Sequence, residues 1–385
     1  GGSVSAILIN TPGTPHAAAT MLDGHPLSKM GRTKAALKIA LYASTFGGIF
    51  SALVLLFLGP QVAKISAQLG TAEYFMVCLF GIAKIGAIMV PVNEQSVHDE
   101  ALYVLDKCRP RVVVTEPSFF DLYRGIQSEN PELVPQLLLA RCDASDGGAR
   151  NLRDDIALQP DELATVVPLS SDDVCEVMYT SGTTSAPKGV EFTHANMLYA
   201  AYYTQWQVSL RGDDRLLTTM PACHSNFQLA AMMPVIAAGA TLVLVEKYSA
   251  HRFWGQVRRY HATVFQAVSM IVRTLLLQPP SERDRDNDVR EVMYFLPLDT
   301  ESKDEFESRF NVRLLNSYGS TESLTWVLTD YPTGERRWPS VGRVGLGYEV
   351  RIADENDLPL PPGEVGEVQI RGVRGRTIMK GYFRD

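Results

Sequence analysis

The chain carries at residues 179–189 the stretch YTSGTTSAPKG, which comes at the end of an apolar run typical of a β-strand. Its glycines and small hydroxyl side chains let backbone N–H groups and hydroxyls approach phosphate oxygens, and Lys188 adds a positive charge. The stretch is not a P-loop, because no Gly-Lys-Ser/Thr triplet precedes a helix. Composition alone favours an ordinary surface turn, so the rest of the chain has to decide between the two interpretations.

Outward from this stretch, the sequence beyond about residue 75 alternates between helix-like segments and short β-branched runs. Helices are expected at residues 73–84 and 98–107. Strands are expected at residues 87–92, 111–115, 175–180, 216–220, 241–246, 263–268, 292–296 and 312–316. Helical segments lie between most of these runs, which predicts an α/β fold with parallel βαβ units. Residues 75–92 are apolar, but Lys84 and the Gly-Ala break favour a buried helix and strand over a membrane span.

The composition excludes several classes of protein. The 385 residues are 46% hydrophobic and 21% charged, which is typical of folded globular chains and not of disordered or collagen-like ones. The formal net charge of -7 argues against a general nucleic-acid binder, which is usually basic. The five cysteines are scattered and form no CxxC pair, so neither disulfides nor a zinc site is expected and a reducing compartment fits best.

The order of residues 179–189 resembles the phosphate-binding loop of the adenylate-forming superfamily of acyl-CoA synthetases, luciferases and peptide-synthetase adenylation domains. Further motifs of that family follow in its order: PACH at 221–224, YGSTE at 318–322, PGEVGE at 362–367 and KGY at 380–382. The resemblance implies the large α/β N-terminal domain of an adenylate-forming enzyme over residues 75–385. It also implies that this domain is truncated at both ends, without the family's opening segment and its C-terminal lid with a catalytic lysine.

The resemblance further implies a chemistry and its residues. The enzyme would activate a small carboxylic acid with ATP and Mg²⁺ to acyl-AMP and then transfer the acyl group to CoA. Tyr318 would stack on adenine, Glu322 would hold Mg²⁺, and His224 would border the acyl pocket, an ordinary core histidine being the alternative for His224. The expected nucleotide-binding residues are Thr180, Ser181, Gly182, Thr183, Thr184, Lys188, Tyr318, Gly319 and Thr321. The expected catalytic residues are Lys188, His224, Thr321 and Glu322.

Stretches outside the shared motifs resemble the crotonobetaine/carnitine–CoA ligases. They are residues 80–93, 244–264, 271–280 and 335–345. Carnitine, crotonobetaine or a similar acid is therefore the expected substrate, with neighbouring short-chain acyl-CoA ligases as alternatives. The sequence departs from the family at Cys223, where an aromatic residue is usual, at Ser320, and at residues 295–299.

Residues 1–74 have a different character. Residues 39–63 hold no charge, which predicts a transmembrane helix, with a long buried helix as the alternative. The basic residues between 29 and 38 place the N-terminal side of such a span in the cytoplasm. The stretches GGSVSAILINTPGTP at 1–15 and AATMLDGHPL at 18–27 resemble the large permease subunit of the tripartite tricarboxylate transporters.

Two domains are therefore expected, residues 1–74 and 75–385. Their unlike character indicates a chimera of two unrelated reading frames. The ligase part is expected in the cytoplasm, and membrane association only if the N-terminal segment is genuine. Acyl-CoA synthesis is expected to be impaired in a chain without the lid. The alternative function is that of a permease fragment fused to an inactive ligase-like tail.

Overall fold

A computed structural model describes residues 25–43, 45, 71–142, 150–160, 166–180, 186–324 and 326–384. The chain divides into two compact units, residues 1–70 and 71–385. In the first unit, residues 25–43 are helical and include a π-helical turn, η2 (Ser28–Arg32). No helix within the described ranges is long and apolar enough to cross a membrane. Most of the span predicted at 39–63 lies outside those ranges, and the structure does not support it.

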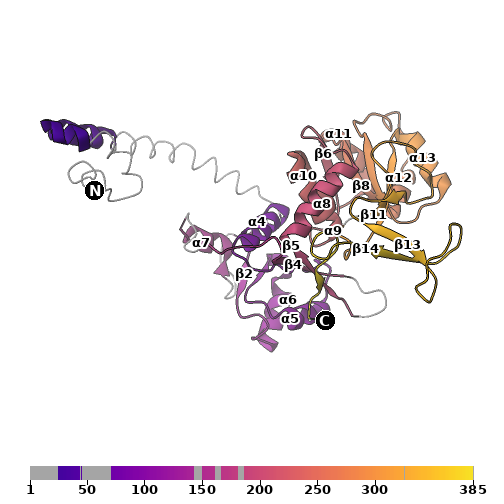
Figure 1. Cartoon of the computed structure of the whole chain (residues 1–385), viewed down its shortest axis with the longest axis horizontal. Helices are drawn as coiled ribbons and strands as arrows, with labels where there is room; N and C mark the ends of the chain where they lie inside the picture. Colours follow the sequence, from indigo (N-terminus) through magenta and orange to yellow (C-terminus); the bar gives the residue numbers. More distant parts are fainter. Residues whose placement is uncertain are drawn as a thin grey trace. The chain divides into compact units, whose positions relative to one another are not determined.

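A seven-stranded sheet forms the centre of the second unit (Figure 1). In spatial order its strands are β12 (Arg343–Val344), β11 (Trp326–Thr329), β10 (Leu314–Gly319), β9 (Glu291–Phe295), β8 (Val264–Val268), β6 (Arg215–Thr218) and β7 (Thr241–Leu244). From β10 to β7 the strands are parallel, which confirms the prediction of βαβ units. The strands β11 and β12 extend the sheet in antiparallel pairing.

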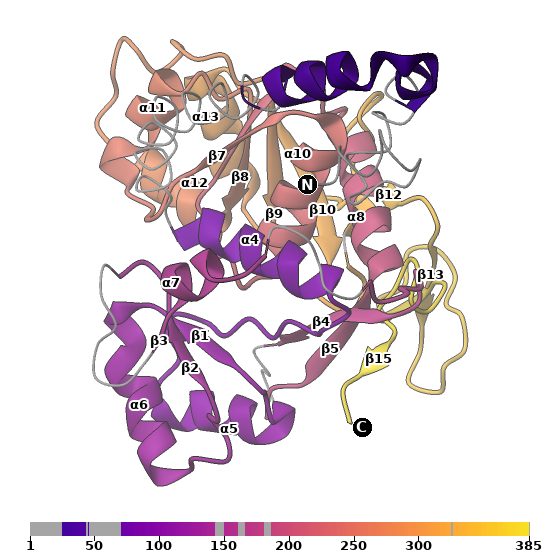
Figure 2. The ribbon, with the colours of Figure 1, turned by 90° about the vertical axis from the view of Figure 1, so that its left-hand side faces the viewer.

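Helices cover both faces of this sheet (Figure 2). Those on one face are α11 (Ala250–Arg259), α12 (Ser269–Leu276) and α13 (Thr300–Phe310). Those on the other face are α8 (His194–Gln207) and α10 (Met233–Ala238), the latter preceded by α9 (Ser225–Phe227) and η4 (Gln228–Met232). Adjacent strand residues serve opposite faces: in β10, Leu314 packs toward α11–α13 and Leu315 toward α8 and α10.

Local side chains fix where these helices begin. The Thr193 hydroxyl accepts a hydrogen bond from the Asn196 N–H over 3.1 Å and caps α8. Asp299 accepts one from the Ser302 N–H over 2.7 Å and caps α13. The same helix ends where Asn311 adopts a left-handed conformation with φ of 54°.

A second sheet is antiparallel and carries the stretch that resembles a phosphate loop. It consists of β4 (Val174–Tyr179), β5 (Gly189–Thr193) and β15 (Gly381–Tyr382). The parallel pairing expected of most strands does not extend to β4, which pairs antiparallel with β5, the next strand along the chain. The strand expected at 87–92 is wrong beyond one bridge from Met89 to Glu176, since Pro91 has no N–H for further pairing.

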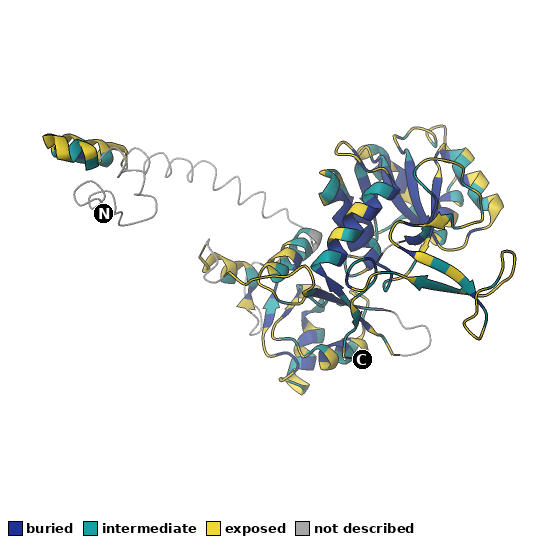
Figure 3. Cartoon of the chain, in the orientation of Figure 1, coloured by how far each residue is buried: buried dark blue, intermediate teal, exposed yellow. Residues whose placement is uncertain are grey.

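The helix expected at 73–84 is confirmed as α4 (Thr71–Lys84) and is followed by a turn in which Gly86 has φ of +70°. The remaining helical elements are α5 (His98–Cys108), η3 (Pro117–Phe119), α6 (Phe120–Glu129) and α7 (Leu152–Ala157). They accompany a small parallel sheet of β1 (Val113–Thr115), β2 (Leu137–Leu139) and β3 (Arg150–Asn151). The strands β13 (Glu349–Ala353) and β14 (Glu367–Arg371) pair separately. Buried residues concentrate in the seven-stranded sheet and the helices against it (Figure 3).

Candidate functional site

The loop after β4 is closed at its base by hydrogen bonds. The Thr180 N–H donates to the Lys188 carbonyl over 3.0 Å. On α5, the Tyr103 hydroxyl donates to the Pro187 carbonyl, also over 3.0 Å. Thr180 and Lys188, the first and last predicted phosphate ligands, are therefore adjacent. The ligands predicted between them, Ser181, Gly182, Thr183 and Thr184, lie outside the described residues.

Lys188 and Glu322 meet at a third side chain, that of Tyr382. The Lys188 ammonium lies 4.7 Å from the centre of the Tyr382 ring, which is a cation–π contact. The Tyr382 hydroxyl donates to Glu322 Oε1 over 3.1 Å. The structure thus brings together two predicted site residues that are 134 positions apart in the sequence (322 minus 188).

Glu322 lies on a tight turn that follows β10. A β-bulge falls between Tyr318 and Gly319, where the strand ends. The Ser323 hydroxyl accepts a hydrogen bond from the Ser320 N–H over 2.9 Å, which fixes the turn that carries Thr321 and Glu322. Tyr318 is 43% exposed, so this aromatic residue is accessible from solvent.

His224 begins the helical segment that follows β6. Its ring Nδ1 accepts a hydrogen bond from the Asn226 N–H over 3.1 Å, so the neutral ring carries its proton on Nε2. The surrounding protein removes water from the ring and lowers the pKa of His224, although part of the side chain remains exposed. The neutral imidazole is therefore favoured.

Two buried glutamines brace the turn that holds His224. The Gln228 amide donates to the Ala222 carbonyl over 3.1 Å, and the Gln266 amide donates to the Asn226 carbonyl over 2.8 Å. Since β6 and β10 belong to the parallel part of one sheet, the segments that follow them leave from the same edge. His224 and Glu322 thus share an edge, but no contact among the described residues joins His224 to Lys188 or Glu322.

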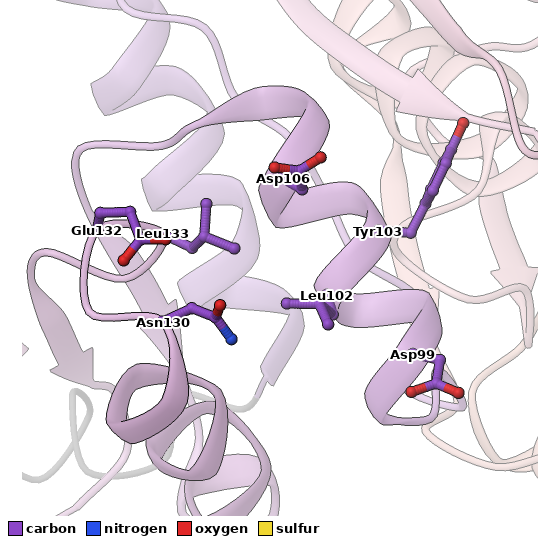
Figure 4. Close-up of a pocket in the computed structure, with 7 residues that line it drawn as sticks. All are labelled: Asp99, Leu102, Tyr103, Asp106, Asn130, Glu132 and Leu133. Carbon is purple, nitrogen blue, oxygen red and sulfur yellow. The ribbon is translucent and has the colours of Figure 1, made fainter.

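A hollow of about 420 Å³ lies elsewhere, between α5 and residues 130–133 (Figure 4). It is lined by Asp99, Leu102, Tyr103, Asp106, Asn130, Glu132 and Leu133. Its carboxylates would repel a phosphate group, and none of the predicted site residues lines it. The hollow is therefore not the nucleotide site predicted from the sequence.

A family model described as AMP-binding enzyme matches residues 54–383. The chain belongs to this family. Crotonobetaine/carnitine–CoA ligases of Escherichia coli O1:K1 / APEC and Shigella sonnei (strain Ss046) are 46% identical to it over 321 residues. The alignments cover 83% of this chain and 62% of each relative. The AMP-binding chain therefore spans less than two thirds of the length of these curated relatives.

Solved structures of CoA ligases share the fold of this AMP-binding enzyme. An anthranilate CoA ligase in complex with anthranoyl-AMP has a TM-score of 0.73 at 23% identity, covering 81% of this chain and 60% of that one. A benzoate CoA ligase from Burkholderia xenovorans LB400 has a TM-score of 0.70 at 22% identity, covering 81% of this chain and 61% of that one. The predicted adenylate-forming fold is confirmed. A second family model, for the tripartite tricarboxylate transporter TctA family, matches residues 1–99 and so overlaps the first over residues 54–99.

The sequence prediction omitted two residues near the site of this AMP-binding enzyme. Tyr382 lies in the KGY motif, but nothing local in the sequence points to its partners Lys188 and Glu322. Glu176 is fully buried in β4 and accepts a hydrogen bond from Gln228 over 2.7 Å. A single carboxyl in the apolar run of β4 was the available signal for Glu176, since carboxyls are rarely buried without a reason.

Proposed function

We propose that this chain activates a small carboxylic acid with ATP and transfers the resulting acyl group to CoA. The observation that supports this most directly is the meeting of Lys188 and Glu322 at Tyr382, beside the base of the phosphate-loop stretch. The 46% identity to crotonobetaine/carnitine–CoA ligases makes crotonobetaine, carnitine or a similar acid the proposed substrate. The impaired acyl-CoA synthesis expected from the sequence stays a prediction.

The proposed reaction has two steps. In the first, a carboxylate oxygen of the acid attacks the α-phosphorus of ATP, the bond to the bridging oxygen breaks, and pyrophosphate leaves. In the second, the CoA thiolate attacks the acyl carbon and AMP leaves with its electron pair. Lys188 and the loop around it would stabilise the negative charge that shifts to pyrophosphate, and the Tyr318 ring would stack on adenine. The neutral His224 would form one wall of the acid pocket.

Glu322 suits a site for Mg²⁺. Within the described part of the chain it makes no ion pair, and no group of three or more potential metal ligands gathers there. Proteins often hold Mg²⁺ through one or two carboxylates together with substrate phosphates, so the single carboxylate of Glu322 suits this ion. Bound there, Mg²⁺ would neutralise part of the phosphate charge.

The function is tested with the full chain, ATP, Mg²⁺, CoA and single acids from a panel of crotonobetaine, carnitine, acetate and benzoate. We expect pyrophosphate release that depends on crotonobetaine or carnitine, with acyl-AMP or acyl-CoA detected by mass spectrometry. Pyrophosphate release that no acid of the panel stimulates would contradict the proposal. Stimulation by benzoate or acetate alone would keep the reaction class and overturn the proposed substrate.

Replacing Glu322 by glutamine is expected to weaken Mg²⁺-dependent binding of a fluorescent ATP analogue about ten- to a hundredfold, since changes around metal sites commonly have effects of that size. Glutamine keeps the shape of the side chain and can still accept from Tyr382, but it lacks the negative charge. The measurement is a Mg²⁺ titration at fixed analogue concentration. Equal binding by the two proteins would exclude Glu322 as a metal ligand.

We further propose that residues 1–74 and 75–385 come from two unrelated frames joined near residue 74. The different families matched at the two ends of the chain support this. The ligase part is proposed to act in the cytoplasm, where ATP and CoA are found, and residues 39–63 to associate with membrane if they are a genuine part of the protein. Sequencing the source DNA across codons 60–90 tests the junction: a continuous genomic reading frame would exclude an assembly artefact.

A further inference from the structure

The segment that ends in Tyr382 is fixed against the phosphate-loop strand. Tyr382 pairs with Val190 of β5, and the Phe383 N–H donates to the Gly189 carbonyl over 2.7 Å. A Cβ added at Gly189 would lie 2.8 Å from Val177 Cγ1 and 3.2 Å from Phe383 Cβ. A side chain at position 189 would therefore crowd Val177 and Phe383, and glycine favours the close approach that sets Tyr382 beside Lys188.

The same segment also fixes Glu322. The Met379 N–H donates to the Glu322 carbonyl over 2.8 Å, so the backbone of Glu322 is tied to the chain three residues before Tyr382. The Tyr382 hydroxyl then holds the Glu322 carboxylate over 3.1 Å. Backbone and side chain of Glu322 are thus both positioned by residues 379–382.

The contacts of Tyr382 keep two opposite charges apart. The Lys188 ammonium lies over the ring, the Glu322 carboxylate accepts from the hydroxyl, and the tyrosine between them is neutral. In the described part of the chain, neither charge is used in an ion pair. A direct Lys–Glu pair would satisfy both groups and would compete with phosphate and metal for them.

We infer that Tyr382 is a positioning residue that holds Glu322 ready for a metal ion and Lys188 ready for phosphate, each by a different part of one side chain. The inference rests on the proposed ATP site and adds to it a residue that acts through Glu322 and Lys188. The Tyr382 hydroxyl donates a hydrogen bond to the Glu322 carboxylate, and the negative face of the Tyr382 ring attracts the Lys188 ammonium. The two parts can be removed separately.

The test compares Tyr382→Phe and Tyr382→Leu with the wild type in binding of a fluorescent ATP analogue across a Mg²⁺ titration. Tyr382→Phe keeps the ring and removes the hydroxyl. It should raise the Mg²⁺ concentration for half-maximal binding about five- to tenfold, with little change in analogue affinity at saturating Mg²⁺. Tyr382→Leu also removes the ring, and it should additionally lower the affinity for the analogue at saturating Mg²⁺ by about threefold.

Tyr248→Phe is the matched control, because the Tyr248 hydroxyl bonds Thr274 over 2.6 Å in a different part of the fold. Its Mg²⁺ titration should coincide with that of the wild type. A Tyr382→Phe titration that also coincides would overturn the inference and leave the proposed function standing. Mg²⁺-dependent binding without acid-stimulated turnover would overturn the function alone, and a wild type that binds no analogue would overturn both.

Discussion

Replacing Lys188 by methionine is expected to slow acid-dependent pyrophosphate release about a hundred- to thousandfold, because groups aimed at developing charge in a transition state commonly contribute that much. Methionine retains much of the length of the apolar stem, so packing against the Tyr382 ring is kept while the ammonium is lost. The loss should fall mainly on kcat, since the charge on the leaving pyrophosphate develops as the reaction proceeds. The measurement is steady-state pyrophosphate release at varied ATP.

A second lysine variant controls for the general effect of removing a charge. Lys303 lies on α13 and pairs with Glu307 over 2.8 Å, away from the phosphate-loop stretch. Lys303→Met should leave the rate within about twofold of wild type, because the ion partners of Lys303, Asp304 and Glu307, are not among the predicted site residues. A Lys188→Met rate as high as that of Lys303→Met would show that Lys188 does not stabilise the transition state.

The parallel part of the sheet could be predicted from the sequence because each strand is a short apolar run between helices. The strand expected at 263–268 is β8, and the strand expected at 292–296 is β9 shifted by one residue. The antiparallel pairing of β4 and β5 could not be predicted in the same way, since an apolar run does not reveal in which direction its partner strand runs. The strand expected at 87–92 is only a single bridge at Met89 for a similar reason. The apolar character of a segment does not reveal whether a neighbouring strand is available to pair along its length.

The candidate site was predictable where motifs are contiguous. Thr180 and Lys188 lie at the two ends of one loop, and Tyr318 to Glu322 lie on one strand end and its turn. The link between these motifs was not predictable, because Tyr382 lies 60 positions beyond Glu322 and their contact depends on the pairing of β15 with β5. Long-range pairing of this kind leaves no periodic signal in either segment.

The buried carboxyl of Glu176, on β4, affects the stability of the fold. Glu176 Oε1 accepts from the Gln228 amide over 2.7 Å, while Oε2 has no partner among the described residues. Burial raises the pKa of Glu176 to about 8, because the charged form loses its hydration, and the hydrogen bond from Gln228 offsets only part of that effect. Burial also raises the pKa of the nearby thiols, Cys175 to about 12 and Cys223 to about 11, so both stay protonated near neutral pH.

Glutamine at position 176 is therefore expected to make the protein less sensitive to alkaline pH. In the wild type the pKa of Glu176 rises on folding from 4.5 to about 8. Between these values the folded state binds more protons than the unfolded chain, so the free energy of unfolding falls as pH rises from about 4.5 to 8. The full loss is roughly 5 kcal/mol, and a glutamine, which stays neutral, avoids it.

Urea unfolding of wild type and Glu176→Gln at pH 5, 7 and 9 measures this effect, because the other titrating groups are common to both proteins and cancel in the difference. The free energy of unfolding of Glu176→Gln, relative to that of the wild type, should rise by several kcal/mol between pH 5 and pH 9. Glu355→Gln, on an exposed turn, is the control. The difference between its free energy of unfolding and that of the wild type should stay nearly constant from pH 5 to pH 9. A constant difference for Glu176→Gln as well would mean that Glu176 ionises in the folded state as readily as in the unfolded chain. The Gln228 amide and its contact with the Ala222 carbonyl would then hold a buried carboxylate, and the turn that carries His224 would rest on a charge instead of a neutral acid.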